Sequence, residues 1–139
     1  MGFIQSAYIK CNTPDIINKL EELKYNNGWY HCLKCNTIGT NIAEDNKGYY
    51  YGIMDERDIK PNQIDCNNNI DLFFAIAALR DDTDINQWFI CTISHYDAIN
   101  NITHEVNDWI LCTTKKIKKH KKIDVWRKAS VNELINHFI

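Results

Sequence analysis

The densest group of charged side chains in this 139-residue chain is a run of lysines near its C-terminal end. In the stretch KKIKKHKK, residues 115–122, six of eight positions are lysine. Ammonium groups spaced so closely repel one another, and a phosphorylated ligand would relieve that repulsion through charged hydrogen bonds. The sequence predicts either an anion-binding element or a solvated loop here. The predicted ligand-binding lysines are Lys115, Lys116, Lys118, Lys119, Lys121 and Lys122.

The charge of the chain is divided unevenly, although the net charge is only −2. Residues 1–114 hold 8 Lys and Arg against 16 Asp and Glu, whereas residues 115–139 hold 8 against 2. Such a dipolar chain can use its basic end on a polyanion and its acidic body for solubility. The alternative is that the two ends neutralise each other across the folded surface.

Aromatic side chains supply the second part of the predicted site. The stretch GYYYGIM places Tyr49 and Tyr51 on one face of an expected strand and Tyr50 on the other. An exposed tyrosine beside lysines can stack on a nucleobase. Tyr49, Tyr51 and Arg127 therefore join the lysines as predicted ligand-binding residues.

Two stretches contain metal-ligating residue types but lack the full pattern of a metal site. HCLKC at 31–35 has one Cys-x-x-Cys pair, while a structural zinc ion needs four ligands. In RDDTDIN at 80–86, Asp82, Asp84 and Asn86 match the first half of a calcium loop. Gln87 and Ile93 then stand where that loop requires glycine and glutamate. We predict no metal; turn capping, ion pairs with Arg80 or Arg57, or a looser magnesium or ligand site remain open for the aspartates.

No stretch has the spacing of a catalytic motif. The sequence has neither a Gly-x-Ser-x-Gly elbow nor a phosphate-binding glycine loop, and His104-Glu105 lacks the second histidine of a zinc protease helix. We therefore expect a non-enzymatic protein without a cofactor. The start of the chain lacks a secretory pattern, so we expect a cytoplasmic location and six reduced thiols. No apolar run is long enough for a membrane span, the longest being LFFAIAAL.

Three strand-to-helix units organise the chain, at 9–20, 64–79 and 126–138. Thr13 followed by Pro14 predicts the first helix start, Asn68 or Asn69 the second, and the Ser130-Glu133 capping box the third. The middle helix is apolar on every side, which predicts that it is the most buried.

Strands are expected at 30–35, 49–53, 88–93, 109–113 and 123–127, from their aromatic and β-branched residues. We expect residues 95–107 to form a polar loop and the lysine run to connect a hairpin. The predicted fold is one α+β domain over residues 1–139, with a mostly antiparallel sheet and about three helices.

Two stretches resemble segments of small uncharacterised proteins of phages and mobile elements in gut bacteria. They are AIAALRDDTDINQWF at 75–89 and WRKASVNELINHF at 126–138, together about a fifth of the chain. The resemblance implies a phage or mobile-element setting and carries no activity or site residue.

The lysines and this setting together suggest a binding protein that sequesters a phosphorylated, nucleotide-type immune signal. Lysines would hold the phosphates, an aromatic ring would stack on the base, and no catalytic group is needed. Exposed aromatic side chains would also allow a homo-oligomer. Three alternatives remain: a nucleic-acid-binding protein that uses the same lysines, an inhibitor that binds a host protein, and an enzyme without a recognisable motif.

Overall fold

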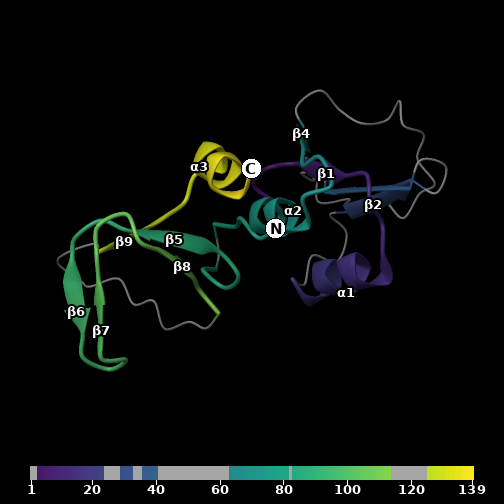
Figure 1. Ribbon diagram of the computed structural model, residues 1–139. Coiled ribbons are helices and arrows are strands. Elements are labelled where there is room, and N and C mark those ends of the chain that lie inside the picture. The colour runs from purple at the N-terminus through teal and green to yellow at the C-terminus, as the bar shows by residue number, and fades with distance from the viewer. Residues whose placement is uncertain (1–2, 24–28, 33–35, 41–62, 82, 114–124) are drawn as a thin grey trace.

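The computed structural model describes residues 3–23, 29–32, 36–40, 63–81, 83–113 and 125–139 (Figure 1). These residues form an α+β fold. Within these ranges no helix combines the length and the apolar character that crossing a bilayer requires. The elements are β1 (Ala7–Ile9), α1 (Pro14–Glu22), β2 (Trp29–Cys32), β3 (Thr37–Thr40), β4 (Ile64–Asp65), α2 (Ile70–Ala77), β5 (Trp88–Cys91), β6 (His95–Asp97), β7 (Ile102–His104), β8 (Trp109–Leu111), β9 (Trp126–Lys128) and α3 (Val131–Phe138).

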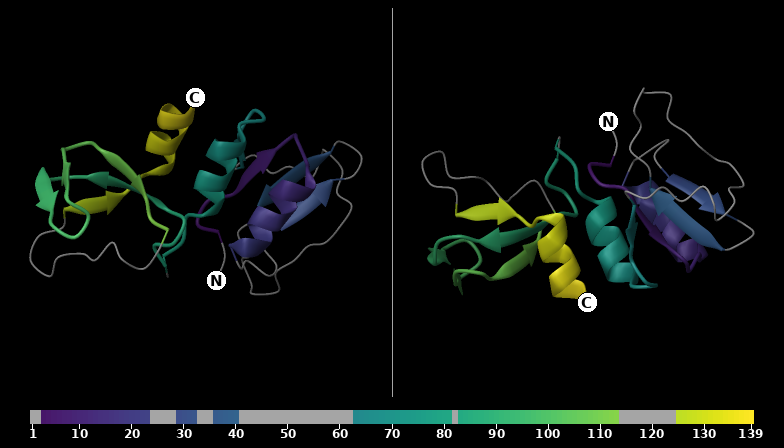
Figure 2. Two further views of the ribbon diagram at one scale, coloured as in Figure 1. Left: turned by 60° about the horizontal axis from the view of Figure 1, so that its bottom comes forward. Right: turned by 90° about the horizontal axis from the view of Figure 1, so that it is seen from above.

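Two sheets lie on either side of α2 and α3, as both views of Figure 2 show. The N-terminal sheet has the order β2-β3-β1-β4, and the second sheet has the order β8-β5-β9. Among the described strands only β1 and β4 pair in parallel, so the sheets are mostly antiparallel as predicted. One core cluster joins both sheets, since it includes Ile38 from β3, Ile90 from β5 and Leu134 from α3.

The three expected strand-to-helix units are confirmed, as β1–α1, β4–α2 and β9–α3. The first two lie side by side, because Ala7 and Tyr8 of β1 pair with Ile64 and Asp65 of β4. The helix starts are also as predicted. The Thr13 hydroxyl accepts a hydrogen bond from the Ile16 N–H, and Ser130 and Glu133 form both bonds of a capping box.

Helix α2 is the central element of the core and contacts α1, α3 and β1. Its buried side chains are Leu72, Phe73, Ala75, Ile76 and Ala77. The prediction that it is the most buried of the described helices is confirmed, since α1 has two buried side chains and α3 has one; Ile70 at its start is exposed and Phe74 is half-buried.

Asn69, rather than Asn68, caps α2, and it also holds the end of α3. Its Oδ1 accepts a hydrogen bond from the Leu72 N–H at 3.1 Å, while its Nδ2 donates to the Phe138 carbonyl. Asn68 instead has a φ of 65°, a left-handed conformation that asparagine tolerates better than most residues. One amide group therefore joins the start of α2 to the end of α3.

Replacing Asn69 by aspartate should lower the free energy of unfolding by about 1 kcal/mol. Aspartate keeps the capping acceptor but loses the donor to Phe138, and its charge faces the negative end of α3. Asn69→Ala should cost about 1 kcal/mol more because the cap is lost as well. Urea unfolding measures both changes, with Asn68→Gly as the neutral control. Wild-type stability in Asn69→Asp would show that the contact with α3 contributes nothing.

Two predictions about chain connections are wrong. β8 and β9 pair with opposite edges of β5, so they are not hydrogen-bonded neighbours and the lysine run does not connect a hairpin. The expected polar loop at 95–107 instead contains the β6–β7 hairpin, in which His95 lies opposite His104. Strand β3 was not predicted at all; it pairs with both β1 and β2.

Candidate ligand-binding cavity

A cavity of about 550 Å³ opens between the helices and the second sheet. Three aromatic side chains from three elements line it: Phe74 of α2, Trp88 of β5 and Phe138 of α3. The other lining residues are Lys19, Glu22, Leu23, Asp71, Ala75, Ala78, Asn86 and Leu111. The volume lies within the range of about 300–1,000 Å³ that is usual for small-molecule sites.

The sheet pleat determines which side chains reach this cavity. Trp88 and Ile90 of β5 point toward the helices, and Phe89 and Cys91 point to the opposite face. Because Trp88 pairs with Leu111 of β8, these two side chains lie next to each other on the helix-facing side. The same periodicity gives the second sheet two packed faces. The second face holds the smaller cluster Phe89, Cys91, Cys112, Val125 and Trp126.

Contacts between rings hold the aromatic wall in place. Trp88 meets Phe138 edge-on with ring centroids 5.6 Å apart, and it meets Trp109 at 6.3 Å. His137 stacks on Trp109 at 3.9 Å with an interplanar angle of 13°. Offset and edge-on ring pairs of this kind are favourable beyond the area that they bury. The wall therefore has a defined shape against which a flat ligand could pack.

Among the described residues that line the cavity, the polar groups are few and of mixed charge. The Lys19 ammonium lies 5.0 Å from the centroid of the Phe74 ring, a cation–π contact. Glu22 and Asp71 contribute two carboxylates against this one ammonium. Asn86 adds a neutral amide and has a φ of 63°, and its N–H donates to the Cys112 carbonyl at 2.6 Å. This lining suits an uncharged flat group better than a phosphate, because the carboxylates outnumber the cation.

Most of the residues predicted to bind a ligand lie outside the described part of the chain. These are the six lysines from Lys115 to Lys122, and Tyr49 and Tyr51. Arg127 lies on β9 and is exposed, and its two terminal nitrogens donate to Glu133 of α3 at 2.6 and 2.7 Å. This bidentate pair joins β9 to the capping box of α3.

The pair also shifts the acidity of both partners. Hydrogen bonds from Arg127 and from the Ser130 N–H lower the pKa of Glu133 from 4.5 to about 2. The hydrogen bond to Glu133 raises the pKa of Arg127 above its ordinary value. A carboxyl group whose pKa is lower in the folded state stabilises the fold above its unfolded pKa. That contribution disappears as the pH falls through the folded value.

Glu133→Gln should therefore lower the free energy of unfolding at pH 7 by about 0.5–1 kcal/mol, the value typical of an exposed pair. The difference from wild type should be constant above pH 4.5 and should vanish as the pH falls toward 2. Urea titrations at several pH values measure it, and Glu21→Gln, at an exposed glutamate of α1, is a matched control. A difference that does not change with pH would contradict the role of the Arg127 pair.

The acidic stretch 80–86 is organised by a lysine from another element. Lys128 of β9 pairs with Asp84 at 3.2 Å and donates to the carbonyls of Arg80 and Thr83 at 2.8 and 3.2 Å. Asp84 thus forms an ion pair with Lys128, a partner that the sequence had not suggested, and Arg57 lies outside the described residues. Asp82 lies outside the described residues. Within the described ranges, no three His, Cys, Asp or Glu side chains are placed to share a metal ion.

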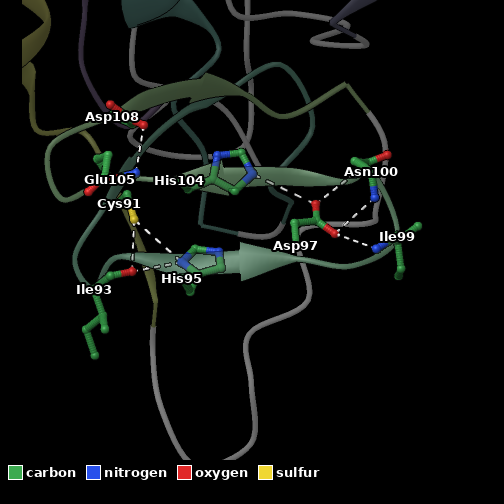
Figure 3. Close-up of polar contacts among 9 residues, drawn as sticks. All are labelled: Cys91, Ile93, His95, Asp97, Ile99, Asn100, His104, Glu105 and Asp108. Carbon is green, nitrogen blue, oxygen red and sulfur yellow. Dashed lines mark hydrogen bonds and ion pairs between the residues drawn. The ribbon is translucent and has the colours of Figure 1, made fainter.

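A cysteine and two histidines meet at the base of the β6–β7 hairpin, in a region that the sequence had indicated as loop (Figure 3). Cys91 Sγ lies 3.7 Å from His95 Nδ1, and both atoms approach the Ile93 carbonyl, at 3.1 and 2.8 Å. A His95 Nδ1 that donates to this carbonyl cannot also accept the thiol proton. Cys91 is moreover only 1% exposed. The arrangement therefore fits a packed hairpin base better than an activated nucleophile.

The buried Cys66 thiol is also unsuited to nucleophilic chemistry. Burial raises the pKa of Cys66 from 9.0 to about 12, and nearby Asp65 adds to the shift. Cys11, Cys66, Cys91 and Cys112 are free cysteines, whereas Cys35 of the Cys-x-x-Cys pair lies outside the described residues.

The cavity residues were not identified as a site from the sequence. Phe74 and Phe138 were assigned to the buried faces of helices, and Trp88 to a strand. The local signal was the pair of phenylalanines, Phe73 and Phe74, on the otherwise aliphatic stretch of α2. No protein-family model matches the chain, and neither the curated proteins nor the solved structures contain a significant match.

Proposed function

We propose that this protein binds and sequesters a phosphorylated, nucleotide-type ligand without transforming it. The main observation in support of this proposal is the cavity lined by the aromatic side chains of Phe74, Trp88 and Phe138. Three ring systems around a volume of about 550 Å³ offer stacking surfaces for a base-sized group. A phage or mobile-element setting, in which such a protein would capture an immune signal, rests on the sequence resemblance alone.

In this proposal the two ends of the ligand contact different parts of the chain. The base packs against the aromatic wall, the Asn86 amide bonds its edge, and the carboxylates of Glu22 and Asp71 accept bonds from sugar hydroxyls. The phosphates stay outside the cavity, since Lys19 is the single positive charge among its described lining residues.

Chain length makes it feasible for the lysine run to hold those phosphates. Leu111 lines the cavity, and Lys115 follows it by four residues. Four residues span at most about 14 Å when fully extended. Lys115, the first lysine of the run, is therefore at most this distance along the chain from Leu111. The distance is about the length of a nucleoside diphosphate. The chain length is thus compatible with a single site that combines the cavity with the lysines.

The test is calorimetric titration with nucleotides, cyclic dinucleotides and the corresponding nucleosides. Phe74→Ala should weaken nucleotide binding about 5- to 150-fold, because stacking on one aromatic side chain contributes about 1–3 kcal/mol. Asn86→Gly removes the amide but keeps a residue that tolerates the positive φ, so a loss of base preference without loss of folding is expected.

Tyr96→Ala is the matched aromatic control, because Tyr96 is exposed on the hairpin and does not line the cavity. Binding that is equally strong in wild type, Phe74→Ala and Asn86→Gly would place the ligand elsewhere. No binding of any nucleotide to the wild type would contradict the proposed function.

A further inference from the structure

The exposed apolar side chains of the described surface are concentrated on the β6–β7 hairpin and its two ends. Nine large hydrophobic residues of the described chain are exposed, and five of them fall between positions 93 and 106. Ile99, at the hairpin turn, is 94% exposed, and Tyr96 is 59% exposed. Clustered exposed apolar residues mark interaction sites far more often than scattered ones do. We name this set the hairpin patch: Ile93, Tyr96, Ile99, Ile102 and Val106. The register places Tyr96 and Ile102 on opposite faces, so the set surrounds the projecting turn that carries Ile99.

The turn that carries Ile99 is fixed by its own hydrogen bonds (Figure 3). Asp97 accepts bonds from the Ile99 N–H at 3.0 Å, the Asn100 N–H at 3.3 Å and the Asn100 side chain at 2.8 Å. The Tyr96 hydroxyl donates to the side chain of Asn101, which has a φ of 54°. A protruding residue held in this way costs little conformational entropy when it enters a partner's pocket.

Ring packing attaches the base of the hairpin to the body, and side-chain bonds close the base itself. Trp126 of β9 meets His95 and His104 edge-on at 5.6 and 5.0 Å. The Ser94 hydroxyl donates to Glu105 at 3.2 Å and accepts from the Val106 N–H at 3.1 Å. Figure 1 shows the hairpin at the end of the molecule that lies away from the N-terminal sheet. The patch is therefore presented on an ordered projection that a partner can reach.

The charge of the hairpin determines which partner it suits. Residues 93–108 contain Asp97, Glu105 and Asp108 and no lysine or arginine. The hydrogen bonds from Asn100 lower the pKa of Asp97, so its carboxylate stays charged at neutral pH. Two hairpins would repel each other. The charge therefore disfavours a symmetric contact between two hairpins and favours a partner surface that carries lysine or arginine.

We propose that the hairpin patch is a docking surface for a foreign protein whose apolar contact area is bordered by lysine or arginine. Ile99 would enter an apolar pocket of that partner, and the three carboxylates would face its basic rim. Fully desolvated central side chains contribute most of the affinity of such interfaces. None of the five patch residues lines the cavity, so this surface and the ligand site can be tested independently.

The probe is a helical peptide with a leucine face and a lysine face, compared with a twin in which every lysine is glutamate. Titration into ¹⁵N-labelled protein should shift resonances of residues 93–108 with the lysine peptide and not with its twin. Ile99→Ser should weaken binding about tenfold or more, the effect of losing a central apolar contact of about 1.4 kcal/mol. Ile4→Ser, at another exposed isoleucine, should leave binding unchanged.

The proposal is overturned if the lysine peptide does not bind, if its shifts fall outside the hairpin, or if Ile99→Ser binds as wild type does. Sedimentation velocity of the free protein tests whether a second copy of the chain binds the hairpin patch. A concentration-dependent dimer that Ile99→Ser abolishes would assign the patch to a second copy and overturn the foreign partner. Nucleotide titration of Ile99→Ser should match wild type, which separates a failure here from a failure of the cavity.

Discussion

Replacing Phe73 by alanine should lower the free energy of unfolding by about 3–5 kcal/mol, and Ile76→Ala by about 2–5 kcal/mol. Both side chains are 0% exposed and lie on α2, which packs against α1, α3 and β1. Deleting either one loses its transfer free energy and leaves a cavity that the surrounding elements cannot fill. Against a typical total of about 5–15 kcal/mol, either change should remove a large part of the stability.

Urea unfolding is the measurement, and an unchanged m-value would show that the same cooperative unit unfolds. Phe74→Ala provides the internal comparison, because Phe74 is half-buried and faces the cavity. Its loss of stability should be smaller than that of Phe73→Ala, although the two residues are neighbours of the same type. Losses below about 1 kcal/mol for both Phe73 and Ile76 would contradict the central position of α2.

Changing Lys119 and Lys121 together to glutamine should weaken binding of the nucleotide-type ligand by about 1–3 kcal/mol per lost charged hydrogen bond. This corresponds to roughly 5- to 150-fold for each lysine. The free protein should not be destabilised, because removing two of six clustered charges lowers their mutual repulsion, and surface changes alter stability by about 0.5 kcal/mol or less. Calorimetry against nucleotides, cyclic dinucleotides and short single-stranded DNA measures the effect.

The control for the lysine variant is Lys10→Gln, which removes an exposed lysine that does not line the cavity. The salt dependence of binding distinguishes a small nucleotide ligand from DNA. Preference for long DNA with a steep loss of affinity on adding salt would indicate a nucleic-acid-binding protein. The lysine variant could bind nucleotide as tightly as wild type while Phe74→Ala binds it more weakly. That result would show that the cavity binds the ligand and that the lysines do not.

The helix starts were determined by the sequence, because each depends on contacts within about four residues. Thr13 bonds the N–H three residues ahead, Asn69 does the same at Leu72, and Ser130 exchanges bonds with Glu133. The three strand-to-helix units and the α+β class follow from these starts and from local periodicity. The sequence left open whether Asn68 or Asn69 caps α2. Asn69 also makes a distant contact, the hydrogen bond from its side chain to the Phe138 carbonyl.

The hairpin at 95–104 shows why a local pattern can fail. Its strands are three residues each and contain His95, Asp97 and His104, which do not favour β structure. The pair is stabilised by Asn101 in the turn and by packing of both histidines on Trp126, which lies more than 20 positions away in the sequence. The polar pattern was real, but a tertiary contact determined the conformation.

Only the tertiary structure determined the sheet partition and the cavity. The β8-β5-β9 order separates two strands that are sequence neighbours, and nothing in their composition distinguishes this order from a hairpin. The cavity takes side chains from positions 19 to 138, on α1, α2, β5, β8 and α3. Local propensity selects elements, but it does not encode how their faces meet across such separations. The same long-range packing placed Arg127 against Glu133 and Lys128 against Asp84, pairings that residue spacing alone could not predict.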